Sequence, residues 1–263
     1  MSAITWVLES EAFPNGDVLH EAAVSHGDRI VAWDDVSWST RAFPRFDGVV
    51  VFHGSLGNAD RIQRELSWSP GAFCDTAKFA CSTWYDSARK WLLQERYEIL
   101  PACELVARAD EIYARHGVDG RVFVRPDSPL KPFSGRIVTR ERMSLAALDH
   151  GFYFDDENLS VVVAPVVSVS NERRFVVVNR TVVAGSGYRP DGRTATIAAR
   201  HNDPAWGYAQ DAAAELPAPS LVYVIDVCES VNGFRVVELN PFGGADLYAC
   251  DAAPIVGAIH ACY

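Results

Sequence analysis

The segment VYVIDVCESVNGFRVVELNPFGG, residues 222–244, consists of two hydrophobic runs on either side of a turn. Val, Ile, Phe and Tyr favour strands, and the Asn-Gly pair at 232–233 favours a tight turn, so the segment predicts a β-hairpin. The second run ends with Glu238, one apolar residue and Asn240. Pro241 follows and is expected to end the strand, because proline cannot donate a hydrogen bond to the ladder.

Three polar side chains of this hairpin are candidate ligands of one Mg²⁺ ion. Glu238 and Asn240 lie two residues apart and therefore share a face of the strand. Asp226 joins them only if the loop has an odd number of residues or the ladder contains a bulge; a two-residue loop centred within the Asn-Gly pair places Asp226 opposite Leu239 instead. Hard oxygen donors without His or Cys suit Mg²⁺. Ordinary capping is the alternative for an isolated Glu-X-Asn, although three such groups buried without partners would cost several kcal/mol.

Positive charge is concentrated in two segments of an otherwise acidic chain. The net charge is −10, yet residues 121–142 and residues 171–200 each contain six basic and two acidic residues. Small anionic ligands or solvated strand faces both account for this pattern. The stretch FVRPDSPLKPFSG, residues 123–135, places Arg125 at a strand end and Lys131 six residues later, in a loop whose backbone N–H groups could cover phosphates.

Composition excludes several classes of function. With 263 residues and 49% hydrophobic content, the chain can bury a sizeable core. No window approaches the roughly 18 apolar residues of a membrane span, and no basic signal region opens the chain, so we expect a cytoplasmic protein without membrane contact. The acidic charge argues against nucleic-acid binding. No P-loop, HExxH, dinucleotide or GxSxG motif is present, and the six cysteines lack CxxC spacing and are expected to be reduced.

The first 75 residues alternate short apolar runs with amphipathic stretches, which predicts a small α/β unit with a mainly parallel sheet. Within it, VVVFHGSLGNADRI has the order strand, turn, helix, with Asn58 or Asp60 as the expected N-cap. Ligands of such sheets bind beyond the carboxyl ends of the strands. His53, Gly54 and Ser55 are therefore candidate substrate contacts, with a simple closing turn as the alternative.

The remainder of the chain changes from helices to strands. Residues 75–117 have apolar spacing of three to four and predict helices, the last of them ending with Gly117 in the C′ position. Strand-forming segments follow from Val118 onward, with a hairpin predicted around Asn179-Arg180. One more helix is expected after Asp203, as its N-cap, with a proline at the first helical position.

Together, RPDSPLKPFSG, NERRFVVV and IDVCESVNGFRVVELNPF resemble the motifs of ATP-grasp enzymes in their order and approximate spacing. The resemblance is closest to a divergent branch in which an arginine replaces the first nucleotide-binding lysine. It extends well over residues 118–250 and loosely over the preceding unit. It implies an α+β fold in which two α+β lobes sandwich ATP behind a small N-terminal α/β domain, with expected boundaries of 1–75, 76–165 and 166–263.

The resemblance also implies the cofactors ATP and Mg²⁺ and a role for each motif residue. Asp226, Glu238 and Asn240 would hold Mg²⁺, and Arg125 and Lys131 would contact the α- and β-phosphates. The other implied contacts are a phosphate loop of Phe133, Ser134 and Gly135, an adenine-reading hinge of Ala164, Pro165, Val166 and Val167, Glu172 at the ribose, and Arg174 at the transferred phosphate. The hinge lacks the acidic residue usual in the family, which leaves the identity of the nucleotide open.

The activity implied by the resemblance is that of an ATP-dependent carboxylate–amine ligase acting through an acyl-phosphate, with Arg174 and Lys131 as catalytic residues. Its substrates would be a carboxylate, from a small molecule or a peptide, and an amine. An ATP-dependent phosphotransferase and a non-catalytic protein that binds a nucleotide or a partner are the alternatives. Besides residues 53–55, the candidate substrate contacts are Arg189, Gly243 and Gly244. The sequence does not determine the substrates or the oligomeric state.

Overall fold

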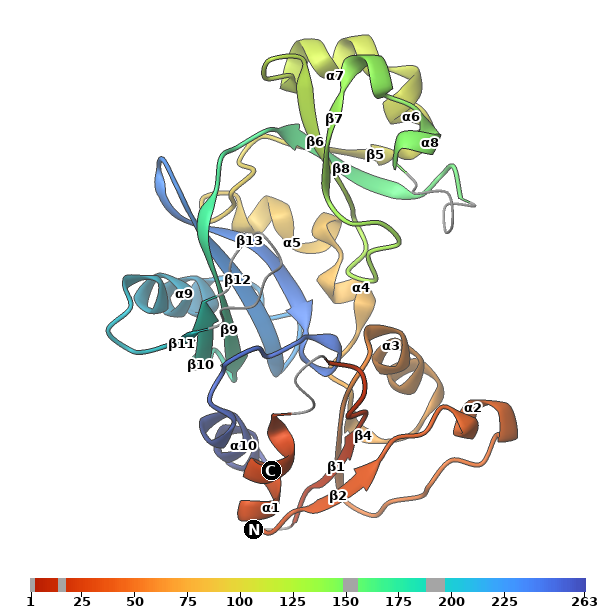
Figure 1. The fold of residues 1–263 in the computed structure, drawn as a ribbon, viewed down its shortest axis with the longest axis vertical. Coiled ribbons are helices and arrows are strands. Elements are labelled where there is room, and N and C mark those ends of the chain that lie inside the picture. The colour runs from red at the N-terminus through yellow and green to blue at the C-terminus, as the bar shows by residue number, and fades with distance from the viewer. Residues whose placement is uncertain (1–2, 14–17, 149–155, 188–196) are drawn as a thin grey trace.

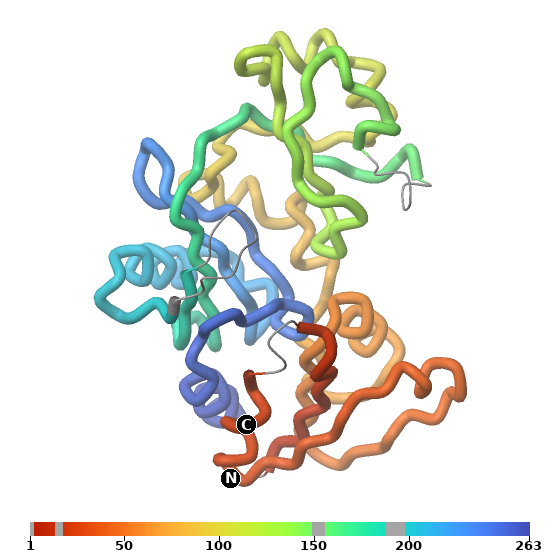
Figure 2. The backbone as a smooth tube through the Cα atoms, in the orientation of Figure 1, coloured from red at the N-terminus to blue at the C-terminus, as the bar shows by residue number. Residues whose placement is uncertain are grey.

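The computed structural model describes residues 3–13, 18–148, 156–187 and 197–263. Three β-sheets follow one another along the chain (Figure 1). The backbone tube in Figure 2 shows the sheet of residues 98–165 at one end of the molecule, the N-terminal sheet at the other, and the C-terminal sheet between them. The predicted order of a small N-terminal unit followed by two lobes is thus present in the described residues.

The N-terminal sheet is parallel throughout, as predicted. Its strands lie in the order β2-β1-β3-β4, and each neighbouring pair is parallel. The strands are β1 (Thr5–Leu8), β2 (Arg29–Ala32), β3 (Val49–His53) and β4 (Ser69–Gly71), and the helices are α1 (Leu19–Ser25), α2 (Val36–Thr40) and α3 (Leu56–Glu65).

The prediction that Asn58 or Asp60 caps α3 is wrong. Ser55 is the N-cap, and its side chain accepts a hydrogen bond from the backbone N–H of Asn58. The Asn58 side chain instead donates to Glu9 and Asp35, at 3.0 and 2.8 Å. Ser55 follows β3 after the single residue Gly54, so the helix begins about one turn earlier than predicted.

The second sheet is antiparallel and has the order β5-β8-β6-β7. Its strands are β5 (Glu98–Pro101), β6 (Arg121–Pro126), β7 (Arg136–Thr139) and β8 (Ser160–Pro165), and its helices are α6 (Ala102–Ala107), α7 (Ala109–His116), η1 (Arg140–Arg142) and α8 (Leu145–Leu148). Gly117 is the C-cap of α7, in an extended conformation with φ −66°, so its predicted C′ position is wrong. Glycine is still required there, because a β-carbon would collide with the carbonyl oxygen of Tyr113.

The third sheet is also antiparallel and has the order β11-β10-β9-β12-β13. Its strands are β9 (Ser170–Val178), β10 (Thr181–Gly187), β11 (Ile197–Ala199), β12 (Val222–Ser230) and β13 (Gly233–Pro241). Asn179 and Arg180 both have positive φ in the β9–β10 turn, as the predicted hairpin requires. Helix α9 (Pro204–Glu215) begins after Asp203, whose side chain accepts from the N–H of Ala205, as predicted.

A bulge in the β12–β13 hairpin sets the position of Asp226. Ser230 pairs with Gly233, which leaves a two-residue loop that alone would not place Asp226 opposite Glu238. Val237 is the extra residue between the pairs Val227–Val236 and Asp226–Glu238. The bulge therefore restores the shared face that the sequence allowed only with an odd loop or a bulge.

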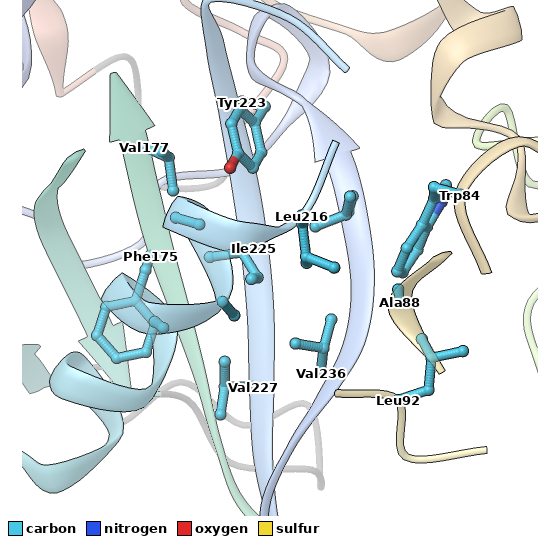
Figure 3. Packing of buried hydrophobic residues seen from close by; sticks show 14 of the residues in the cluster. Trp84, Ala88, Leu92, Phe175, Val177, Leu216, Tyr223, Ile225, Val227 and Val236 are labelled. Atoms are coloured by element: carbon cyan, nitrogen blue, oxygen red, sulfur yellow. The ribbon is translucent and has the colours of Figure 1, made fainter. Parts of the chain in front are cut away.

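One face of the C-terminal sheet is covered by helices from two distant parts of the chain (Figure 3). Trp84 of α5 (Cys81–Ala88) and Leu92 pack with Val236, while Trp206 of α9 packs with Phe175. Phe79 of α4 (Thr76–Phe79) belongs to the same core. The predicted boundaries at 75/76 and 165/166 remain predictions; because this core unites the helices with the C-terminal sheet, we propose to count residues 76–92 with the C-terminal lobe.

The opposite face of the same sheet is divided into an apolar half and a polar half. Val176 and Val224 of the apolar half share a core with Trp6 of β1 and Ile255 of α10 (Ala252–His260). This packing joins the N-terminal domain to the C-terminal lobe. The polar half lies two residues further along the strands, where Asp226 pairs with Arg174 on one side and with Glu238 on the other.

Candidate functional site

The three candidate metal ligands converge, as their predicted positions on one face require. The Nδ2 of Asn240 donates to Oδ2 of Asp226 and to Oε1 of Glu238, each at 3.0 Å. Asp226 is fully buried, Asn240 is 7% exposed and the Glu238 side chain is 14% exposed. Three polar groups from the two strands of the hairpin thus form one connected, nearly buried cluster.

Two basic side chains, one in β6 and one in the loop after it, form ion pairs with Glu238. Arg125, at the end of β6, donates from Nη2 to Oε2 of Glu238 at 2.9 Å and from Nη1 to the carbonyl of Val237 at 3.3 Å. The Nζ of Lys131, in the β6–β7 loop, lies 2.7 Å from Oε1 of Glu238. Burial would raise the pKa of the Glu238 carboxyl, but Lys131 and Arg125 hold that pKa well below its usual value. The cluster therefore joins the two lobes through a carboxylate that stays ionised.

Arg174 binds the other carboxylate. Its Nε and Nη2 contact Oδ1 and Oδ2 of Asp226 at 2.8 and 2.7 Å, and its Nη1 donates to the carbonyl of Asp246 at 2.7 Å. The guanidinium also lies over the ring of Tyr248, 5.0 Å from the centroid. Burial raises the pKa of Asp226, and Arg174 only partly opposes that rise. The predicted contact of Arg174 with a transferred phosphate stays a prediction, since this guanidinium is paired with Asp226 here.

The donor set fits Mg²⁺ bound jointly with phosphates. Mg²⁺ in nucleotide sites takes one or two carboxylates and completes its shell with phosphate oxygens and water. Asp226, Glu238 and Asn240 supply two carboxylates and an amide at one point. Within residues 3–13, 18–148, 156–187 and 197–263, no group of three or more His, Cys, Asp or Glu side chains is arranged to hold a metal. The cluster is thus suited to a metal that arrives with its own anionic ligands.

The predicted hinge borders a cavity between the lobes. Pro165 and Val167 line a space of about 240 Å³ together with Arg235 and the segment 93–96. Ala164 is fully buried and is paired with Phe123 inside the sheet, so the cavity side of the hinge begins at Pro165. Ser230 and Asn232 of the hairpin tip also line the cavity. Val166 and Glu172 are partly buried and are not lining residues, so their predicted contacts with the nucleotide stay predictions.

In the predicted phosphate loop, the first residue is buried and the next two are exposed. Phe133 is buried in the core of the second sheet, and the Arg136 guanidinium lies 4.9 Å from its ring centroid. Ser134 and Gly135 are exposed. A β-carbon at Gly135 would come within 2.8 Å of the Phe123 ring, so glycine lets the loop lie close to the sheet.

The candidate substrate contacts of the N-terminal domain are engaged in joining that domain to residues 243–245. The His53 ring contacts the carbonyl of Ala245 at 3.0 Å, and Gly54 donates to Gly243 at 2.8 Å. Ser55 donates its N–H to the Glu9 carboxylate. Gly243 donates its N–H to the carbonyl of Ala72, and a β-carbon at Gly244 would collide with Leu56. Substrate contact by these residues stays a prediction, and Arg189 lies outside the described residues.

Two residues near the cluster were not predicted from the sequence. Asp127 follows β6 and accepts from the N–H and Oγ of Ser82 at 2.7 and 2.8 Å, which fixes the start of the phosphate loop to α5. Tyr248 adopts φ +51° and places its ring under Arg174. An aspartate after proline and a tyrosine in a glycine-rich loop carry no local signal for these contacts, because both partners are distant in sequence.

Comparison with known families agrees with this geometry. The model of a family described as an ATP-grasp domain matches residues 59–259, which is more than half of the chain. This protein belongs to the ATP-grasp family. The match includes both lobes and all three candidate metal ligands, and it confirms the fold expected from the resemblance. By sequence, no match to a curated protein was found.

Solved ATP-grasp structures share the fold along nearly the full length of the chain. The crystal structure of the D-cycloserine synthetase DcsG is 16% identical, with 98% of each chain covered and a TM-score of 0.67. The ATP-grasp ligase PsnB in complex with a phosphomimetic variant of its minimal precursor, Mg and ADP is 14% identical, with 99% of each chain covered and a TM-score of 0.60. The D-alanine–D-alanine ligase from Bacillus anthracis is 12% identical, covering 98% of this chain and 97% of its own, with a TM-score of 0.60. Among the described residues of this ATP-grasp protein, no helix is long and apolar enough to span a membrane.

Proposed function

We propose that this protein is an ATP-dependent ligase that joins a carboxylate to an amine and requires Mg²⁺. The observation that carries the proposal is the cluster between the lobes, where Glu238 accepts from Arg125 and Lys131 while Asn240 connects it to Asp226. Carboxylates for a metal and cations for phosphates lie within hydrogen-bonding distance of one another, as joint binding of a metal and a nucleotide requires. The synthetase and ligases with the same fold, named above, support the same class of reaction.

The nucleotide would lie across the two lobes. Its base would occupy the cavity of about 240 Å³ beside Pro165 and Val167. Its phosphates would contact Arg125 and Lys131 beneath the loop of residues 133–135. Asp226, Glu238 and Asn240 would hold Mg²⁺, which when bound neutralises the charge that develops on the phosphates. Ala164 and Val166 would form the rest of the hinge that reads the base, and Glu172 would contact the ribose.

The protein contributes position and charge to the reaction. An oxygen of the substrate carboxylate attacks the γ-phosphorus of ATP, the bond to the β,γ-bridging oxygen breaks, and an acyl-phosphate and ADP result. The amine then attacks the acyl carbon, phosphate leaves with the electron pair of the broken C–O bond, and the amine loses a proton to form the amide. Arg174 and Lys131 would stabilise the charge on the transferred phosphoryl group, and most of the rate would come from alignment of the reactants.

Formation of ADP in the presence of paired substrates tests the proposal. Amino acids and short peptides are supplied in carboxylate–amine pairs with Mg²⁺ and ATP, and products are read by mass spectrometry. A ligase releases ADP together with a product whose mass equals the sum of both substrates less one water. ADP with a phosphorylated product and no need for the amine identifies a phosphotransferase. Absence of ATP turnover with every pair, in folded protein that binds Mg²⁺-ATP, leaves a non-catalytic nucleotide-binding protein and contradicts the proposal.

A further inference from the structure

The Lys131 ammonium occupies the carboxylate oxygen that the proposed metal requires. Nζ lies 2.7 Å from Oε1 of Glu238, the same oxygen that accepts from Asn240 at 3.0 Å. Arg125 occupies the other oxygen at 2.9 Å. Oε1 thus accepts two hydrogen bonds, one from a cation and one from an amide, and a metal can bind this oxygen only after one of the two has moved. Oε2 accepts one hydrogen bond, from Arg125, whose positive charge opposes a metal on that side.

Of the two cations, Lys131 is the one that can move. Arg125 lies within β6, is 7% exposed and makes a second hydrogen bond to the carbonyl of Val237. Lys131 lies in the loop after β6, and its side chain is 36% exposed. Its backbone has φ +49°, a conformation that disfavours residues with side chains, and its N–H makes a long hydrogen bond of 3.3 Å to Ser128. A partly exposed side chain on a loop leaves its partner more easily than a guanidinium buried within a strand.

The charge of the cluster excludes a metal that arrives without an anion. Arg125, Lys131 and Arg174 supply three positive charges, and Asp226 and Glu238 supply two negative charges, which leaves one positive charge. A divalent cation added to this nearly buried group would meet uncompensated positive charge, and such charge is costly away from water. The negative charge of a nucleoside triphosphate exceeds the single excess positive charge of the cluster. The same phosphates attract the ammonium of Lys131.

We infer that Lys131 is a positioning residue that closes the metal site until a nucleoside triphosphate draws its ammonium away from Glu238. This inference rests on the proposed function and adds an order to it: metal and nucleotide bind together, and free metal does not bind. In the absence of nucleotide, the ion pair with Lys131 therefore prevents Mg²⁺ from binding Glu238. In the nucleotide complex the same ammonium contacts phosphate, so one residue acts in two states.

Binding of Mn²⁺, followed by electron paramagnetic resonance, tests this order without a catalytic readout. Wild-type protein and the variants Lys131→Met, Lys131→Arg and Lys90→Met are titrated with Mn²⁺, with and without AMPPNP. Met keeps the length of lysine without its charge. Lys90→Met is the matched control, because Lys90 pairs with Glu215 of α9, which packs on the opposite face of the sheet.

Wild-type protein is expected to take up Mn²⁺ only with AMPPNP. Lys131→Met is expected to bind free Mn²⁺ at least about tenfold more tightly than the weakest binding detectable for wild type, because one repelling charge has been removed from beside Glu238. Lys131→Arg and Lys90→Met should behave as wild type without nucleotide. No gain in Lys131→Met, or equal uptake by wild type with and without AMPPNP, would overturn the inference. Failure of wild type to bind AMPPNP at all, even with Mn²⁺, would instead overturn the proposed function.

Discussion

Removal of the Arg174 guanidinium is predicted to destabilise the folded protein strongly at neutral pH. In Arg174→Met, the fully buried Asp226 loses hydrogen bonds of 2.8 and 2.7 Å and keeps one of 3.0 Å from Asn240. Breaking a buried ion pair from one side costs about 3–5 kcal/mol, because the remaining charge is left without compensation. Since Asn240 still donates to Asp226, we expect a loss near the lower end, about 3 kcal/mol in the free energy of unfolding.

The loss should depend on pH in a defined direction. Burial raises the pKa of Asp226 and Arg174 opposes that rise, so the variant has a higher folded-state pKa than wild type. A carboxyl whose pKa is higher in the folded than in the unfolded state stabilises fully below the unfolded value, about 3.9, and loses that contribution as pH rises through the folded value. The difference between wild type and variant should therefore be smallest in acid and largest at neutral pH.

Urea unfolding followed by circular dichroism, at about pH 5 and about pH 8, measures both effects. Arg173→Met is the matched control from the same strand: Arg173 lies 2.6 Å from Asp203, but the two side chains are 18% and 20% exposed. Its loss is expected to be about 1 kcal/mol or less. Equal losses in the two variants, or a loss in Arg174→Met that does not change with pH, would refute the assignment of Asp226 as a buried carboxylate that depends on Arg174.

Three further outcomes follow from the structure. Gly243→Ala should lower the midpoint of thermal unfolding, because its β-carbon would collide with the carbonyl oxygen of Ala72, whereas Gly207→Ala, with no atom within 4 Å, should raise stability by up to about 1 kcal/mol; the reverse order would contradict the packing of the domain junction. Ser55→Ala should cost about 1 kcal/mol in urea unfolding through loss of the α3 N-cap, and an unchanged free energy would place the cap elsewhere. Because the pKa of Glu238 is well below its usual value, the stability that wild type has over Glu238→Gln should be present above about pH 4.3 and disappear as pH falls through the lowered folded value. Acid titration by circular dichroism checks this, and a difference that grows on acidification would contradict it.

The hairpin and the convergence of its three polar side chains could be predicted because local pattern determines them. Strand alternation places Glu238 and Asn240 on one face, and the family motifs point to Asp226 as the third member. The register required an odd loop or a bulge, and the bulge at Val237 supplies it. Turn chemistry predicted the Asn179-Arg180 hairpin in the same way, because asparagine tolerates positive φ, and Arg180 adopts positive φ beside it.

Contacts between distant segments could not be predicted in this way. Arg125 and Glu238 are 113 residues apart, and neither strand pattern indicates their ion pair. The same holds for Arg174, whose partner Asp226 lies on the neighbouring strand β12. The sequence does not single out Ser55 as the N-cap of α3, because a serine after glycine is equally typical of the turn after β3. The N–H of Gly243 donates to the carbonyl of Ala72 of the N-terminal domain. This contact depends on how that domain packs, which no local sequence pattern indicates.

Calorimetry of ATP binding with and without Mg²⁺ determines whether Asp226, Glu238 and Asn240 bind the metal that accompanies the nucleotide phosphates. Wild-type protein is predicted to bind ATP more tightly with Mg²⁺ than without it. The double variant Glu238→Gln with Asn240→Ala should lose that metal-dependent gain while remaining folded. Affinity that does not depend on Mg²⁺ in wild type, or a double variant that binds Mg²⁺-ATP as wild type does, would contradict this metal assignment.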